Sequence, residues 1–217
     1  NISPAAPTVS KPVGQSSIEV AGQPGQAAGA AREATAPPPA LPFPVPTDYG
    51  VYALHNGALS ELSRLPEQVA DKRISVSTPV SQPSRTTISD GKTRFILFRR
   101  DLVGNAPERI DVRVVARIAR VLAFDSKGKP SLSPVSDAWN IRNQAYEFRV
   151  RPIPGNPEML MVQPENPDFV LPAGRYVLTL RDQGYDFTVA GEVTDLAHCL
   201  ERTDAANGAF YSQCQKL

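Results

Sequence analysis

The sequence lacks any apolar run long enough to cross a membrane as a helix. Such a span needs about 18 to 20 consecutive, mostly apolar residues. The longest candidate, residues 112–124, is interrupted by Arg113, Arg117 and Arg120. We therefore expect no membrane span in this chain.

Histidine and cysteine are also scarce, with two of each in 217 residues. Neither His55 nor His198 is accompanied by cysteines or carboxylates at the spacing of a zinc site. The sequence has no Gly-x-Ser-x-Gly motif, no phosphate-binding loop ending in Gly-Lys-Ser/Thr and no dinucleotide-binding Gly-x-Gly-x-x-Gly motif. We expect no metal and no cofactor. Enzyme activity is left open, and a non-enzymatic role is the better prediction.

The net charge of +1 gives the chain no general attraction to nucleic acid. The sequence has no zinc-knuckle spacing and no run of lysines interleaved with aromatic residues. We therefore expect no nucleic-acid partner.

Proline, by contrast, is abundant, with 22 residues, roughly twice the average usage. Residues 1–46 are rich in Pro, Ala, Gly, Gln and Ser and contain almost no large apolar residues, so they cannot bury enough surface to offset the entropy of ordering. We predict a disordered tether over 1–46, stiffened by polyproline II structure over 36–46, and a single β-rich domain over 47–217. The chain starts at Asn1, which fits removal of a signal peptide or an engineered boundary.

The domain sequence consists of short apolar or alternating segments separated by turn signals. Asn56-Gly57 lies between two such segments and predicts a tight β-hairpin. Further strands are predicted at 73–76, 93–99, 109–124, 146–151, 159–163, 175–180 and 185–189. This pattern is typical of a mostly β fold, an antiparallel β-sandwich or an open barrel.

The segment 109–124 fits two kinds of secondary structure. Apolar residues alternate from Ile110 to Ile118 as in a strand, while arginines recur every four residues from Arg109 to Arg117 as on a helix face. Its high content of β-branched residues favours the strand.

One short C-terminal helix is predicted, beginning near the N-cap residue Thr194 and ending before Asn207-Gly208. Cys199 lies on it, fifteen positions before Cys214. If the chain is exported, pairing the two cysteines stabilises the fold by about 3 kcal/mol, and we predict this disulfide. The alternatives are two free thiols in a cytosolic protein, or a reactive Cys199 beside His198. Adjacent helix residues point about 100° apart, which disfavours such a dyad.

Charge is distributed unevenly along the domain. Residues 90–151 hold 13 Lys and Arg against 7 Asp and Glu, whereas residues 152–204 hold 3 against 9. The basic region could form a stripe across adjacent strands that binds carboxylate or phosphate groups, or the two regions could neutralise each other through cross-strand pairs. The candidate binding residues are Arg99, Arg100, Arg109, Arg113, Arg117, Arg149 and Arg151.

Three stretches carry a resemblance: residues 49–62, residues 171–189 with the element Leu171-Pro-Ala-Gly-Arg-Tyr, and residues 198–214 around the two cysteines. Together they resemble uncharacterised exported proteins of bacteria, of unknown function. The resemblance covers most of 47–217. It implies a periplasmic or extracellular location and supports the disulfide, and it brings no catalytic residues.

The leading functional hypothesis is a non-enzymatic binding module of the bacterial cell envelope, presented on a flexible tether. Its expected partner is another envelope protein or an anionic cell-surface polymer, bound on the exposed sheet face or an edge strand. One alternative is a hydrolase acting on envelope carbohydrate or peptide, with carboxylates such as Glu147, Asp168 or Asp186 in a cleft. Another is a structural subunit in which the tether orders against a neighbour.

Overall fold

The structure is a computed structural model that describes residues 40–69 and 76–217, all within one compact unit. The predicted tether lies outside the described residues except for positions 40–46. The described residues form fourteen strands. These are β1 (Gly50–His55), β2 (Ala58–Glu61), β3 (Ser63–Gln68), β4 (Val76–Val80), β5 (Thr87–Ile88), β6 (Arg94–Phe98), β7 (Arg109–Phe124), β8 (Pro130–Pro134), β9 (Trp139–Ile153), β10 (Asn156–Pro164), β11 (Gly174–Leu180), β12 (Gln183–Val189), β13 (Cys199–Ala205) and β14 (Gly208–Gln213).

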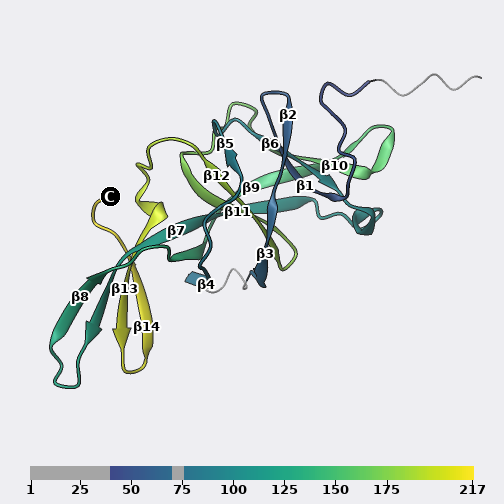
Figure 1. The fold of residues 1–217 in the computed structure, drawn as a ribbon. Helices are drawn as coiled ribbons and strands as arrows, with labels where there is room; N and C mark the ends of the chain where they lie inside the picture. Colours follow the sequence, from purple (N-terminus) through teal and green to yellow (C-terminus); the bar gives the residue numbers. More distant parts are fainter. Residues whose placement is uncertain (1–39, 70–75) are drawn as a thin grey trace, which may run out of the picture. The chain divides into compact units, whose positions relative to one another are not determined.

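The main sheet is a nearly closed barrel. Its strands follow the order β2-β1-β6-β10-β9-β7-β11-β12-β3, and every neighbouring pair along this path is antiparallel (Figure 1). The first and last strands of the path are consecutive in the chain, because only Leu62 separates β2 from β3. The backbone N–H of Leu62 donates to Val51 of β1, after which the chain leaves β1 and joins β12. Of the two predicted architectures, the open barrel is the one observed.

One buried cluster fills the barrel interior, and its members alternate along each strand. Phe95 and Leu97 of β6 point inward, together with Phe148 of β9 and Phe187 of β12. Ile96 of β6 lies on the outer face. The aromatic rings are in contact, with centroids 5.1 Å apart for Phe95 and Phe187. The interior is therefore packed with side chains and is not a channel.

The outer face is also covered in two places. Leu41 and Phe43 pack on a cluster that includes Ile96, so the last residues of the predicted tether contact the domain. Elsewhere Val115 and Val177 pack with residues of β3 and β4. Strands covered on both sides need apolar residues at nearly every position.

Two local predictions are confirmed by the backbone. Asn56 and Gly57 have φ values of 48° and 74°, as a two-residue hairpin turn requires, and they join β1 to β2. Residues 109–124 form one strand, β7. Its ambiguous pattern arises because residues 112–116 are buried on both faces of the sheet.

β7 is shared between the barrel and a second group of strands, which we call the arm. The arm consists of residues 118–124 of β7 with β8, β13 and β14 (Figure 1). β8 pairs antiparallel with β7, β13 pairs parallel with its other edge, and β14 pairs antiparallel with β13.

The predicted C-terminal helix is wrong. The structure has a single 3-10 turn at Leu196–His198, in which the Asp195 carboxylate accepts from the backbone N–H of Ala197. From Cys199 the chain continues as β13, because β7 and β14 supply backbone partners on both of its edges. Asn207 lies in the turn between β13 and β14. Among the described residues, no helix is long and apolar enough to span a membrane.

Cys199 and Cys214 form a disulfide, with Cα atoms 5.4 Å apart. The backbone N–H of Cys214 also donates to the carbonyl of Cys199, at 3.2 Å. The disulfide closes the base of the β13–β14 hairpin, and both cysteines are buried.

A candidate anion-binding cleft

Most of the arginines predicted to bind a ligand are already neutralised. Arg99 pairs with Asp101 at 2.8 Å, Arg149 pairs with Glu165 at 2.6 Å, and Arg109 pairs closely with Glu147 on the neighbouring strand. Arg100 lies 3.8 Å from Glu158. Exposed ion pairs of this kind contribute little to stability, but they reduce the field that an incoming anion meets.

Arg113 and Arg117 do not form a common binding surface. Arg113 is only 1% exposed, and its Nε donates to the carbonyl of Arg142 at 2.6 Å. Arg117 is exposed, opposite Trp139 of β9 and Cys199 of β13. The predicted stripe is therefore interrupted at Arg113, which cannot contact a ligand on the surface.

Three of the predicted arginines do come together. Arg149 of β9 lies opposite Arg109 of β7 and Gln163 of β10. Arg151 follows two residues later on the same strand, so its side chain lies on the same face. The sheet register thus produces a basic outer face over β10, β9 and β7.

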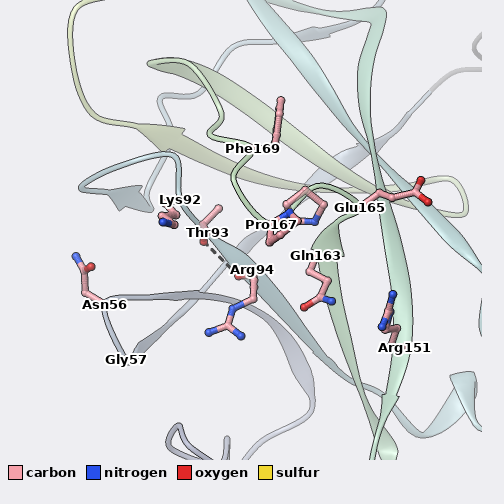
Figure 2. Close-up of a pocket in the computed structure, with 11 residues that line it drawn as sticks. Asn56, Gly57, Lys92, Thr93, Arg94, Arg151, Gln163, Glu165, Pro167 and Phe169 are labelled. Atoms are coloured by element: carbon pink, nitrogen blue, oxygen red, sulfur yellow. Dashed lines mark hydrogen bonds between the residues drawn. The ribbon is translucent and has the colours of Figure 1, made fainter.

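This face leads into a cleft of about 630 Å³, which we call the hairpin cleft (Figure 2). It is lined by the β1–β2 turn, the start of β6, strands β9 and β10, and the loop that follows β10. The positive side chains in it are Lys92, Arg94 and Arg151. In Figure 2, Arg94, Gln163 and Arg151 follow one another across the cleft, and Glu165 extends away from Arg94.

The segment that carries Lys92 and Arg94 is held in place by its backbone. The Asp90 carboxylate accepts from the N–H of Lys92 at 2.8 Å, and the Thr93 hydroxyl donates to the carbonyl of Leu54 at 3.2 Å. Gly91 packs directly against Leu171, whose carbonyl oxygen would lie 1.8 Å from an added Cβ. Only glycine fits at this position. Together these contacts fix the backbone from which the side chains of Lys92 and Arg94 extend.

The charges in the hairpin cleft are unbalanced. Among the described residues that line it, Glu165 is the only carboxylate, and Arg149 already pairs with it. Neither Lys92, Arg94 nor Arg151 has an ion-pair partner in the described part of the chain. A ligand with carboxylate or phosphate groups would supply the missing negative charge.

The three carboxylates suggested for a hydrolase lie apart from one another. Asp186 is buried in a two-point ion pair with Arg175, at 2.9 and 3.0 Å. Glu147 pairs with Arg109, and Asp168 lies exposed in the loop after β10. The described lining of the hairpin cleft includes none of the three.

His198 is buried against strands β7 and β11 of the barrel. Its Nδ1 lies 3.3 Å from the carbonyl of Val115, and its Nε2 lies 3.2 Å from the hydroxyl of Tyr176. Burial lowers the pKa of His198, against smaller opposing effects of the Val115 carbonyl and Asp195. Across the described residues, no group of three or more His, Cys, Asp or Glu side chains is placed to hold a metal ion.

No local sequence pattern marks Lys92 and Arg94 as site residues, because their neighbours in the cleft come from far along the chain. Arg151 lies on β9, and Gln163 on β10. One signal was present, since both residues fall in the basic region 90–151. Which charged residues of this region lie close together depends on strand register and loop packing, and local sequence patterns do not predict either.

Comparisons with protein families, with characterised protein sequences and with solved structures found no match.

Proposed function

We propose that this chain is a non-enzymatic binding module of the bacterial cell envelope, and that its hairpin cleft binds an anionic polymer. The observation that carries the proposal is that three cations, Lys92, Arg94 and Arg151, line one cleft without ion-pair partners among the described residues. Guanidinium groups bind carboxylate and phosphate with two parallel hydrogen bonds. A repeating anion can engage several such groups at once.

The basic outer face supports a polymer rather than a single small anion. Arg109 and Arg149 lie next to the cleft, each paired with a glutamate near the surface. A polymer that leaves the cleft over β9 could exchange those exposed pairs for its own charges at little cost. The cleft would then bind one part of the polymer, and the basic outer face would provide further contacts along its length.

The envelope location is supported by the disulfide and by the resemblance to exported bacterial proteins. Disulfides persist mainly in oxidising compartments such as the bacterial periplasm. A disulfide-bonded β domain is compatible with export. The proline-rich composition of residues 1–46 suits a spacer that carries the domain away from an attachment point.

Binding to poly-L-glutamate and to polyphosphate tests the proposal. The R94A/R151A variant should weaken binding by about tenfold or more, because hydrogen bonds to charged groups contribute about 1.5–3 kcal/mol each. The matched control is R117A/K129A, which removes the same charge from two other exposed positions that have no ion-pair partner among the described residues and should change affinity less than about threefold.

Three results would decide against the proposal. Equal weakening in both variants would mean that affinity follows net charge and not the cleft. No binding of either polymer at low salt would reject an anionic polymer, and capture of an envelope protein through the same arginines would favour the protein partner. Loss of native structure in R94A/R151A can be checked by circular dichroism, and R94Q/R151Q then replaces it.

A further inference from the structure

A second cleft lies where the barrel closes. β2 ends at Glu61 beside β1, and β3 starts at Ser63 beside β12. The continuous segment β2–β3 therefore links β1 to β12, and the chain bends at Leu62 between the two strands. A cleft of about 590 Å³ lies at this bend, which we call the seam cleft, and it is lined by residues 49–51, 61–64, 85, 99 and 185.

Three arginines reach the seam cleft from separate segments. Arg64 comes from β3, Arg85 from the segment between β4 and β5, and Arg99 from the end of β6. Arg64 and Arg85 have no carboxylate within ion-pair distance in the described ranges 40–69 and 76–217. Glu61 is the only carboxylate in the described lining.

Arg99 and Tyr185 give this cleft a fixed polar wall. The Nε and Nη2 atoms of Arg99 donate to Asp101 at 2.8 and 3.0 Å, and its Nη1 donates to the Tyr185 hydroxyl at 2.6 Å. That hydroxyl donates to Gln183 at 3.2 Å. The ring of Tyr185 is buried in the barrel interior, so the guanidinium is held before any ligand arrives. Held donors lose little entropy on binding.

Two features separate the seam cleft from the hairpin cleft. The described lining residues of the two clefts do not overlap. Arg94 and Arg99 lie at opposite ends of β6, about 17 Å apart at a strand rise of roughly 3.4 Å per residue. A ligand small enough to fill one cleft therefore does not reach the other.

We infer that the seam cleft is a second binding site, for a compact anion that carries a carboxylate or phosphate group. Arg64 and Arg85 would hold the anionic group, and Arg99, fixed by Asp101 and the Tyr185 hydroxyl, would orient it through its remaining N–H groups. The volume of about 590 Å³ lies within the range of roughly 300–1,000 Å³ that is usual for small-ligand sites. The inference uses residues outside the hairpin cleft and does not depend on the polymer-binding proposal.

Titration of the isotopically labelled full chain with inorganic phosphate and with glutarate, followed by NMR, tests this site. Saturable shifts are expected at the backbone amides of Gly50 and of residues 61–64. The R64A/R85A variant should raise the dissociation constant by about tenfold or more. The R94A/R151A variant is the matched control and should leave it unchanged. The stronger of the two probes identifies phosphate or carboxylate as the preferred group.

Tyr185→Phe provides a second test, because it removes the hydroxyl that holds Arg99 and keeps the buried ring. We expect a weaker effect than in R64A/R85A, with the dissociation constant raised about threefold. Shifts that do not saturate, or that are the same in wild type and R64A/R85A, would overturn the inference. An equal loss in R94A/R151A would do so as well, since the response would then follow net charge. Loss of polymer binding alone would affect only the hairpin cleft.

Discussion

The barrel and the arm are both built from hydrogen-bonded strands but bury very different amounts of surface. The barrel interior contains side chains such as Phe95 and Phe187 that are 0% exposed. In the arm, all of β8 is exposed, and Phe210 of β14 is 53% exposed. The residues buried there lie at its base and are a small cluster around Ile118 and Leu200 together with the two disulfide cysteines.

Because the arm buries little apolar surface, it needs other sources of stability than a hydrophobic core. Pairing gives the arm its geometry, but apolar burial supplies most of the stability of a folded domain. In the arm the disulfide between Cys199 and Cys214 fixes the two ends of the β13–β14 hairpin. The ladder to β7 then connects this hairpin to the barrel.

The largest expected effect is the difference in stability loss between a Phe→Ala substitution in the barrel and one in the arm. Phe95→Ala should lower the free energy of unfolding by about 3–5 kcal/mol, because it leaves a cavity in the packed interior. Phe210→Ala should change it by less than about 0.5 kcal/mol. Chemical denaturation of both variants measures the contrast. Similar costs for the two would mean that Phe210 is buried in solution and that the arm has an apolar core of its own.

The next effect concerns the disulfide. C199S/C214S should lower the free energy of opening the β13–β14 hairpin by about 3 kcal/mol, as expected for a closed loop of this length. The loss should be local, so hydrogen exchange should speed up in β13 and β14 while β6 and β11 stay protected. The control is dithiothreitol treatment of the wild type, which should reproduce the variant. Uniform loss of protection would show that the arm and the barrel unfold as one unit.

The smallest effect depends on pH and on His198, which lies where the barrel meets the arm. Burial lowers the pKa of His198 in the folded state, below about 6.5 in the unfolded chain. The unfolded state therefore binds the proton more readily, and stability present above about pH 6.5 should fall as the pH drops toward the folded pKa. Arg142 also lowers the pKa of His198, while Asp195 raises it.

Thermal unfolding between pH 7.5 and 5 measures this dependence. The drop in melting temperature should be smaller in His198→Gln than in the wild type, because carboxylate titration is common to both and cancels in the difference. An equal drop in the two proteins would remove His198 as its source.

Local patterns predicted part of this fold. Asn56-Gly57 predicts its hairpin because both residues tolerate positive φ, and β-branched residues predict β7 over 109–124. The prediction of a C-terminal helix was wrong because it used local signals alone. Thr194 and Asp195 resemble a helix start, but a long-range pairing with β7 decides the structure from Cys199 onward. The sequence does not report that pairing.

The same limit applies to the candidate site. A stripe of arginines and neutralisation by cross-strand pairs were the two alternatives, and the register brings Arg109, Arg149 and Arg151 to one face while Arg109 also pairs with Glu147 across the strands. Arg113 has the same residue type and spacing, yet its strand is covered on both sides there and the side chain is buried. Whether a charge in a strand meets solvent depends on the layers that cover it, and therefore on tertiary structure.

The disulfide has a mechanical consequence. A pulling force applied at Leu217 would enter the fold at Cys214 and pass through the sulfur–sulfur bond directly to Cys199. The residues between the two cysteines would carry no tension, so the β13–β14 hairpin would stay folded and add no length to the stretched chain. The first structure to feel the load would be the short turn at Leu196–His198, next to the barrel wall.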